Sequence, residues 1–379
     1  MRTIIYGDGI AGRTIASLLY RGGHEVTHLC GGTGVSPEGD YPVMLWPHGG
    51  RILHELGVYE EYEKKSTEVN TQLLYGSRGK LLNLYALRDI TPSFYPPRVV
   101  SKAQLLKVLK DEVIDAEKGL NIETVSNEPD EIIVTLSDGS TVAGDVLIFA
   151  DGLDSKSTEY VNTRKRTRSA AWSCFVQWLP AEKAPLDELV ERWWAGCAVS
   201  VYPCKERTGL LVCIANDIST MSCNDNLKAY YETVANVLSS YGIDWESQLA
   251  AINSVTPDYY PMSDARADTW VKGRAALLGD AAISYLPGSH VGASMALESA
   301  SVLADELSRA PGKFAPDALK LYARRRKPRA EFVQNQARAV MEFKLVKSLR
   351  YARMRDTLIR FHDMRQLTGP KVKLLQAPL

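Results

Sequence analysis

Residues 3–29 read TIIYGDGIAGRTIASLLYRGGHEVTHL and contain the strongest fold signal in the chain. An apolar run enters a glycine-rich turn, an amphipathic stretch follows, a glycine pair closes it, and a second apolar run begins. This order predicts a strand, a helix and a second strand. Gly7, Gly9 and Gly12 match the GxGxxG spacing that lets a backbone approach a pyrophosphate at a helix amino terminus. The segment therefore predicts dinucleotide binding, and an ordinary glycine-rich turn is the alternative.

The second predicted strand ends at a residue that departs from the dinucleotide-binding pattern. Such folds usually carry Asp or Glu there, where the carboxylate binds ribose hydroxyls. This chain has Cys30, and a thiol is a poor hydrogen-bond acceptor. Asp8, inside the glycine turn, adds a carboxylate near the expected phosphates.

Composition restricts the classes of partner. The chain has 379 residues, 45% of them hydrophobic, and zero formal net charge. Its size allows a large core and two or three structural units, and its charge gives no indication of a nucleic-acid partner. Six cysteines form no CxxC pair and no zinc-type spacing, so we expect reduced thiols and no metal site. The sequence opens on the strand-like RTIIYG and has no apolar run of bilayer length, so we expect a cytoplasmic protein.

After a region that indicates a second sheet, the chain returns to the strand-and-glycine-turn pattern of its first residues. A helix capped by Ser101 and a hairpin turned at Asp138 precede a buried strand that ends in ADG. Aromatic and alternating runs over 170–216 indicate a second sheet, and helical patterns follow at about 225–252. A strand over 274–278 then runs into Gly279 and Asp280, as a cofactor-facing strand would.

Five segments together resemble one known family. They are GDGIAG at residue 7, VMLWPHGGRILHELGV at 43, VVSKAQLLKVL at 99, DVLIFADGLDSKS at 145, and WVKGRAALLGDAAISYLPGSHVGASMALESASVLADEL at 270. In this order, from residue 1 to about 330, they look like the single-chain FAD-dependent aromatic hydroxylases and epoxidases, the p-hydroxybenzoate hydroxylase-like flavoprotein monooxygenases. Their joint occurrence is more specific than any one motif.

The resemblance implies an α/β fold with a Rossmann-like FAD-binding domain on a parallel sheet, a substrate domain on a mostly antiparallel sheet, and C-terminal helices. The implied boundaries are 1–66, 98–158 and 265–330 for the discontinuous FAD-binding domain, 67–97 and 159–264 for the substrate domain, and 331–379 for the C-terminal helical segment.

The resemblance also assigns cofactor-binding residues. The pyrophosphate loop corresponds to Gly7, Gly9, Ala11 and Gly12; the second-strand position to Cys30; the start of the third helix to Lys102; the DG motif to Asp151 and Gly152; the ribityl-binding acid to Asp280; the proline against the flavin ring to Pro287; and the helix start at the pyrimidine edge to Gly292, Ala293 and Ser294. That helix would direct its positive end at the part of the ring that gains charge on reduction.

Several of these positions depart from the family pattern. Cys30 replaces an acid, Lys102 keeps the charge of an arginine but not its planar fork, Ile283 replaces a histidine, and His290 replaces a glycine. These differences indicate either looser FAD binding or a divergent branch of the family in which the residues that bind FAD have another use.

The implied reaction depends mainly on the cofactor. Members of the family reduce FAD with NADH or NADPH, form a C4a-hydroperoxyflavin with O2, and transfer one oxygen atom to an electron-rich small molecule. We therefore expect hydroxylation or epoxidation of an apolar, aromatic or polycyclic substrate, with transient NAD(P)H or a separate flavin reductase as electron source. The rival is a non-redox cyclase or isomerase with lost or structural flavin. A flavin-dependent halogenase is disfavoured because its WxWxIP signature is absent.

Two histidines are the candidate catalytic residues. His48 and His290 fall where the family chain passes near flavin and substrate, and an imidazole titrates near neutrality, so either could move a proton. Hydrogen-bonded packing is the alternative for both. Aromatic residues of the second sheet could line the substrate pocket or simply form core; they are Trp172, Trp178, Trp193, Trp194 and Tyr202.

The C-terminal segment is strongly basic. Residues 324–373 carry 15 Arg and Lys against four acids. The spacing of Val340, Met341, Leu345, Leu349 and Ala352 indicates amphipathic helices that cover the core. A basic amphipathic helix can also contact a membrane, but the ordinary apolar stripe favours a packing helix, so we do not expect membrane association.

Overall fold

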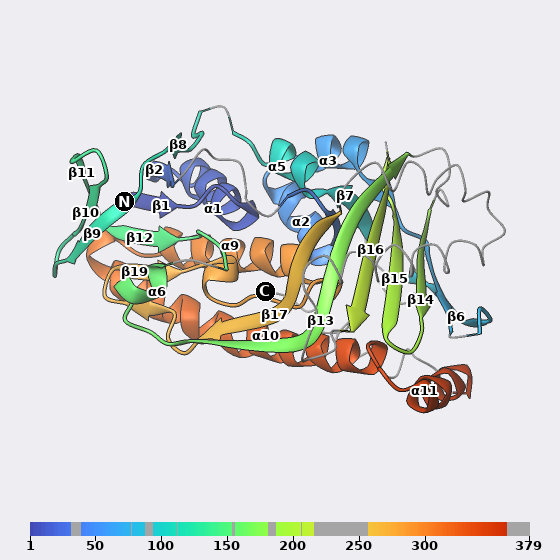
Figure 1. Cartoon of the computed structure of the whole chain (residues 1–379). Helices are drawn as coiled ribbons and strands as arrows, with labels where there is room; N and C mark the ends of the chain where they lie inside the picture. The colour runs from blue at the N-terminus through green and yellow to red at the C-terminus, as the bar shows by residue number, and fades with distance from the viewer. Residues whose placement is uncertain are drawn as a thin grey trace.

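The computed structural model describes residues 1–31, 39–76, 78–87, 94–111, 113–153, 156–180, 187–205, 207–215 and 257–361. These residues form two sheet-based halves joined by one long helix (Figure 1). The predicted helical patterns near 225–252 lie outside the described residues.

A six-stranded sheet forms the first half. Its order is β18(Val271–Lys272), β19(Ala275–Leu277), β12(Val146–Phe149), β1(Arg2–Tyr6), β2(Glu25–Cys30) and β8(Glu117–Lys118). All neighbours are parallel except β18 and β19. The central strand β12 reads VLIF and is buried along its whole length, which is typical of a parallel sheet covered on both faces. Strands far apart in sequence therefore end at the same edge.

Three helices position this half. They are α1(Ile10–Arg21), α9(Gly292–Ser308) and α10(Ala315–Lys344). Helices α1 and α9 pack against each other, and α9 packs against α10 (Figure 1). Helix α10 runs without a break through Pro328 and reaches the second half of the molecule.

The second half is a seven-stranded sheet. Its order is β17(Asp258–Ala267), β13(Lys165–Pro180), β16(Arg207–Ala215), β15(Cys197–Pro203), β14(Glu188–Trp193), β5(Thr71–Tyr75) and β6(Leu81–Ala86). Only β14 and β5 pair in parallel. The predicted second, mostly antiparallel sheet is confirmed.

Smaller elements complete the described chain. A three-stranded hairpin sheet contains β9(Ile122–Asn127), β10(Ile132–Leu136) and β11(Thr141–Gly144), and another contains β3(Pro42–Leu45), β4(Thr67–Glu68) and β7(Arg98–Ser101). The remaining helices include α2(Pro47–Glu55), α3(Tyr59–Lys65), α5(Lys102–Val108), α6(Ser157–Tyr160) and α11(Leu349–Phe361), with single 3-10 turns η2(Gly279–Ala281) and η3(Gly312–Phe314).

Two local predictions are confirmed by backbone geometry. The Ser101 hydroxyl accepts the Gln104 N–H at 3.2 Å and caps α5. Gly139 turns the β10–β11 hairpin with φ of 83°, a value that glycine adopts without steric cost.

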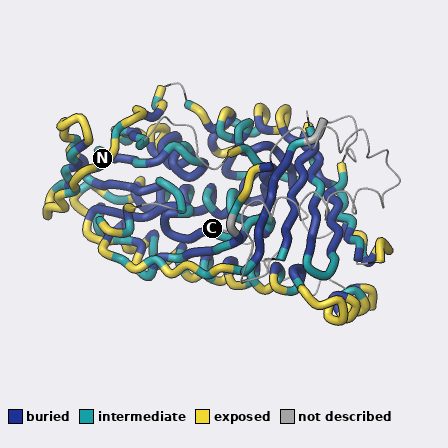
Figure 2. The backbone as a smooth tube through the Cα atoms, viewed as in Figure 1, coloured by how far each residue is buried: buried dark blue, intermediate teal, exposed yellow. Residues whose placement is uncertain are grey.

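One prediction about the C-terminal helices is wrong. Met341, Leu345 and Ala352 are buried as expected, but 51% of Leu349 is exposed. The periodic pattern breaks there because α10 ends at Lys344 and α11 begins only at Leu349, so the two helices do not share one apolar face. Figure 2 shows most of α11 exposed.

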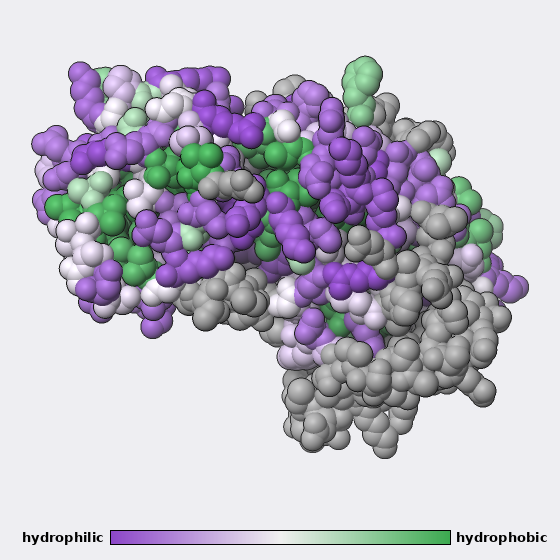
Figure 3. Space-filling model, turned by 90° about the horizontal axis from the view of Figure 1, so that it is seen from above, coloured by the Kyte–Doolittle hydropathy of each residue, from purple (hydrophilic) through white to green (hydrophobic). Residues whose placement is uncertain are grey.

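The face of the molecule seen from above has ordinary surface character. Seen from above, hydrophobic side chains lie in separate patches among hydrophilic ones (Figure 3). Within the described residues, no helix is both long and apolar enough to cross a bilayer.

Candidate FAD and substrate site

The glycine turn between β1 and α1 is built by close backbone packing. Gly7 has φ of 127°, and a Cβ there would lie 2.3 Å from the Ala150 carbonyl oxygen. A Cβ on Gly12 would lie 1.8 Å from the Gly7 carbonyl oxygen. Any larger side chain at either position would collide with backbone that cannot move aside. These two glycines bring the start of α1 against the end of β12.

Gly9 differs from its neighbours because its surroundings are open. A Cβ on Gly9 would meet no atom within 4 Å. Gly9 is also the N-cap of α1, and no side chain caps that helix. An uncapped helix start presents N–H groups and the positive end of the helix dipole to whatever lies in front of it.

The loop after β19 meets this helix start. A Cβ on Gly279 would lie 2.8 Å from the Ala11 Cβ, so the segment that carries Asp280 touches the first turn of α1. Helix α9 begins beside it at Gly292, also without a side-chain cap. The start of α1 and the Asp280 loop, about 270 residues apart in sequence, therefore meet. Helices α1 and α9, which pack against each other, both begin without a side-chain cap.

The DG segment lies at the same sheet edge. Gly152 has φ of 89°, and Asp151 accepts a hydrogen bond from the Ser157 hydroxyl at 2.9 Å. Lys165 connects the two loops, since its ammonium donates to the Leu153 carbonyl at 2.5 Å and to the Asp280 carbonyl at 3.1 Å.

The end of β2 has an unusual charge arrangement. Asp8 is nearly buried and forms a bidentate pair with Arg13, with Nε–Oδ1 of 2.7 Å and Nη2–Oδ2 of 2.8 Å. Arg13 also donates to the Leu106 carbonyl at 2.6 Å. Burial and the Asp8 charge raise the pKa of the Cys30 thiol, so it is protonated at neutral pH. The carboxylate at this end of the site is therefore engaged by an arginine.

Lys102 is buried at the start of α5. Its ammonium lies 4.9 Å from the centre of the Tyr41 ring, and its backbone N–H donates to the Tyr41 carbonyl at 2.9 Å. The aromatic face stabilises the cation in a setting that excludes water.

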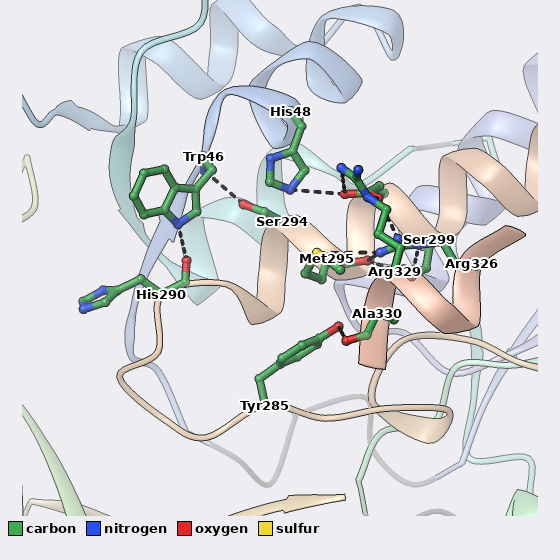
Figure 4. A network of polar contacts seen from close by, with 11 residues as sticks. Trp46, His48, Tyr285, His290, Ser294, Met295, Ser299, Arg326, Arg329 and Ala330 are labelled. Carbon is green, nitrogen blue, oxygen red and sulfur yellow. Dashed lines mark hydrogen bonds and ion pairs between the residues drawn. The ribbon is translucent and has the colours of Figure 1, made fainter. Parts of the chain in front are cut away.

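The loop between Pro287 and α9 is held by Trp46. Its indole N–H donates to the His290 carbonyl at 2.6 Å, and its backbone N–H donates to the Ser294 hydroxyl at 3.0 Å (Figure 4). His290 adopts φ of 60°, which costs energy for a residue with a Cβ. The surrounding contacts therefore hold His290 in a conformation that glycine would adopt more easily.

The His290 side chain points toward the second sheet. Its Nδ1 lies 3.3 Å from the Tyr202 hydroxyl, and its Nε2 lies 3.6 Å from Glu191 Oε1. The Glu191 carboxylate accepts three further hydrogen bonds. The donors are the Lys344 ammonium at 2.5 Å, the Ser200 hydroxyl at 2.8 Å and the Gln72 amide at 3.0 Å.

Glu191 stays ionised although it is buried. Burial alone would raise its pKa, but the charge of Lys344, and hydrogen bonds from His290 and Lys344, hold that pKa well below its ordinary value. Lys344 is also buried, so the pair is a desolvated ion pair in the second half of the molecule.

His48 lies in a different cluster. Its Nε2 is 3.5 Å from Glu298 Oε2, and Glu298 also pairs with Arg326 at 2.6 Å and Arg329 at 2.5 Å. Burial lowers the pKa of His48 to about 4, with Glu298 opposing the change and the two arginines adding to it. His48 is therefore neutral near pH 7, and its side chain points away from that of His290 (Figure 4).

Sequence reasoning missed Glu191, Ser200 and Lys344. Glu191 lies inside a buried strand, and Lys344 is one of many cations in the basic segment. The only available signal was a charged residue in the buried run ELVERW. Among the described residues, no group of His, Cys, Asp and Glu could hold a metal ion.

Comparison with known proteins places these features in context. A family model described as "FAD binding domain" matches residues 1–337. The 3-hydroxybenzoate 6-hydroxylase 1 of Aquipseudomonas alcaligenes is 28% identical, with 90% of this chain and 88% of that protein aligned. The FAD-dependent monooxygenase asqG of Emericella nidulans is 26% identical over 81% of this chain, which spans 60% of the length of that relative.

Solved structures share the fold. Klebsiella pneumoniae HpxO complexed with FAD and uric acid has a TM-score of 0.86 at 21% identity, covering 99% of this chain and 97% of HpxO. The tetrameric form of 2-methyl-3-hydroxypyridine-5-carboxylic acid oxygenase has a TM-score of 0.77 at 21% identity, covering 100% and 98%. The predicted fold class and the family resemblance are confirmed.

Proposed function

The chain belongs to the FAD binding domain family of FAD-dependent monooxygenases, and from that premise we propose that it inserts one oxygen atom from O2 into an apolar, aromatic or polycyclic small molecule. The observation that carries the proposal is the meeting of the open Gly9 turn with the Asp280 loop and the uncapped start of α9. When bound, FAD reduced by NAD(P)H supplies the oxygen chemistry.

The described residues fit FAD along most of its length. The first turn of α1, with Gly9, Ala11 and Gly12, would bind the pyrophosphate through N–H groups. Asp280 would accept hydrogen bonds from the ribityl hydroxyls. The open space beside Gly9 is what a backbone cradle requires, because a cofactor can approach it without displacing a side chain.

The start of α9 would face the pyrimidine edge of the ring. Gly292 and Ala293 carry little or no side chain, and Ser294 is occupied by the Trp46 N–H, so backbone groups remain for this contact. Pro287 would lie against the ring. The positive end of the helix dipole would stabilise negative charge there. Asp151 and Gly152 would support the same region.

Lys102 and Cys30 would flank the other end of the cofactor. Lys102 supplies a compact cation at the start of α5. Cys30 supplies no carboxylate for the ribose, so this contact is the weak part of the cradle.

We propose His290 as the residue that moves a proton at the substrate. It lies on the loop that follows Pro287, and its ring contacts Tyr202 and faces the Glu191 carboxylate. An anionic Glu191 stabilises imidazolium, so His290 can accept a proton from a substrate hydroxyl or ring N–H and hold it. Glu191 and Lys344 are positioning residues, since they act on substrate only through His290.

His48 receives a different role. Its lowered pKa and its place behind the first turns of α9 support a packing function. The neutral imidazole fills space beside Glu298 without adding a third cation to the Arg326 and Arg329 cluster.

The substrate would lie between the Pro287 loop and the second sheet. Trp172, Trp193 and Tyr202 are buried in that sheet and supply apolar wall. The names of the relatives mention 3-hydroxybenzoate, and the HpxO crystals contained uric acid. Both are small planar ring compounds, which supports a ring-containing substrate for this chain.

The test uses the full purified chain. It should bind FAD with visible flavin absorbance, and it should oxidise NAD(P)H faster when a panel of hydroxylated ring compounds supplies a substrate. Mass spectrometry should then find one oxygen atom, labelled from 18O2, in the product. Protein that stays colourless after incubation with FAD, or product labelled from water, would contradict the proposal.

A further inference from the structure

Helix α11 presents a stripe of exposed apolar side chains. Tyr351, Met354, Leu358 and Phe361 are 62%, 54%, 45% and 81% exposed. At about 100° per residue they fall within roughly 80° of one another around the helix. The adjoining face, with Ala352, Arg355 and Ile359, is buried. The helix is therefore packed along one face and exposes apolar side chains along the next.

Cations flank the stripe on one side. Arg350, Arg353 and Arg360 are exposed on the arc next to it, and Lys347 is exposed just before the helix. Asp356 is the one acid of α11, and it is held by Arg355 at 2.9 Å on the packed side. The exposed surface of α11 is therefore apolar and positive, with no exposed acid.

Arg355 fixes this helix to the body. Its guanidinium donates to the Lys344 carbonyl at 2.7 Å and to the Trp193 carbonyl at 3.0 Å. It also lies 5.4 Å from the centre of the Trp193 ring. These bonds hold α11 at a defined angle, so the stripe is presented outward as a preformed surface.

The charges decide which occupant fits. A second copy would pair the stripe with itself about a two-fold axis and bring the arginines of both copies together without acids to neutralise them. An anionic lipid bilayer meets both requirements, because acyl chains take the apolar stripe and headgroups take the cations. We propose that α11 docks this protein on an anionic membrane surface, with the helix lying in the plane of the interface.

The proposal departs from the expectation drawn from the sequence, which took the C-terminal pattern as core covering. Only one face of α11 covers core, and its largest apolar side chains face outward. The docking surface is linked to the substrate side of the molecule through Arg355, Lys344 and Trp193. An apolar substrate dissolved in a bilayer would then be near the sheet that supplies the proposed pocket wall.

Vesicle sedimentation tests the proposal with the full chain. Vesicles of phosphatidylcholine with 30% phosphatidylserine (roughly the anionic surface described for cytoplasmic leaflets) should bind the protein, and pure phosphatidylcholine vesicles should bind it much less. Binding to the anionic vesicles should fall as salt is raised. Changing Arg350, Arg353 and Arg360 to Gln should weaken binding about fivefold per arginine, about a hundredfold together.

The apolar contribution is tested separately. Leu358→Glu should weaken binding by about tenfold or more, because it removes buried apolar surface and adds a repelled charge. Leu321→Glu is the matched control, since Leu321 is also about half exposed but lies on α10. Circular dichroism and flavin content should be unchanged in both variants.

Three results would overturn the proposal. One is equal binding of the parent protein to neutral and anionic vesicles, and another is equal loss of binding in the L321E and L358E variants. The third is a stable dimer in sedimentation velocity that L358E dissociates while vesicle binding is absent, because the stripe would then be an interface between copies or with another protein.

Discussion

The proposed FAD cradle, which is the glycine turn, the Asp280 loop and the start of α9, is built from backbone. The His290 network, which links His290 to Glu191 and Lys344, is built from side chains. The cradle uses glycines, helix starts and strand ends, and its tightest contacts are between backbone atoms. The network uses single side chains from five separate segments, which are β14, β15, β5, the Pro287 loop and the end of α10. A substitution that adds atoms to the cradle must displace backbone, so we expect it to be poorly tolerated. Substitutions in the network should be tolerated when they keep its charges balanced. The two regions should therefore respond differently to substitution.

The largest effect should come from the backbone region. Gly12→Ala should prevent folding or cost about 3 kcal/mol or more in the free energy of unfolding, because its Cβ would lie 1.8 Å from the Gly7 carbonyl oxygen. Thermal unfolding of the FAD-free protein measures this. Soluble yield is the second measurement if the variant does not fold.

Gly9→Ala is the matched control for that variant. A Cβ at Gly9 meets no atom within 4 Å, so the FAD-free protein should keep its melting temperature. Affinity for FAD, measured by quenching of flavin fluorescence, should still fall because the added methyl group occupies the cradle. Unchanged FAD affinity in Gly9→Ala would show that the cofactor does not approach this turn.

The next largest effect on stability should come from breaking the buried Glu191–Lys344 ion pair. Lys344→Met should destabilise the fold by about 3–5 kcal/mol, since it leaves the buried Glu191 carboxylate without its cation. Lys344→Met with Glu191→Gln should recover most of that loss. Chemical denaturation of both variants measures the difference, and a double variant as unstable as the single one would mean that the pair is not balanced in this way.

The two regions also differed in how far the sequence predicted them. GxGxxG, the DG motif and the GD motif each occupy neighbouring positions, so they can be recognised in the sequence, and the family resemblance implied that the strand ends before them meet. Glu191 and Lys344 are 153 residues apart and meet only because α10 crosses under the second sheet. Neither residue type nor spacing contains that geometry. Leu349 was mispredicted for a related reason, since periodicity cannot locate the break between α10 and α11.

The His48 cluster gives a pH-dependent test. Because the pKa of His48 falls from 6.5 to about 4 on folding, its contribution to stability is present above pH 6.5 and is lost as the pH falls toward 4. The loss should reach about 3 kcal/mol. His48→Gln should remove most of this acid sensitivity while leaving His290-dependent activity unchanged. Denaturation curves at pH 7, 5.5 and 4.5 measure it, with Glu191→Gln as a control for acid loss that begins only below about 4.5.

A variant of His290, unlike one of His48, should change activity much more than stability. His290→Gly relaxes a backbone held at φ of 60° but removes the imidazole that contacts Tyr202 and Glu191, so the free energy of unfolding should change by no more than about 1 kcal/mol. Turnover should fall about a hundredfold, with FAD affinity retained, because the proton acceptor is lost. The kcat against pH profile should lose the titration that belongs to the His290 imidazole. A profile that keeps this titration in the variant would assign the proton transfer to another group.

The smallest effect would strengthen the cradle where it is weakest. Cys30→Glu places a carboxylate at the end of β2, where related folds bind the ribose. A charge-assisted hydrogen bond to a ribose hydroxyl should tighten FAD binding by about tenfold. Arg13 is near enough to offset repulsion from Asp8, since both already influence the Cys30 thiol.

The control for that gain is Cys30→Ser, which matches the size of the thiol and adds no charge. FAD dissociation constants of the two variants separate the carboxylate from simple loss of the thiol. If Cys30→Glu binds FAD no better than Cys30→Ser, the ribose does not lie over the end of β2 in this protein.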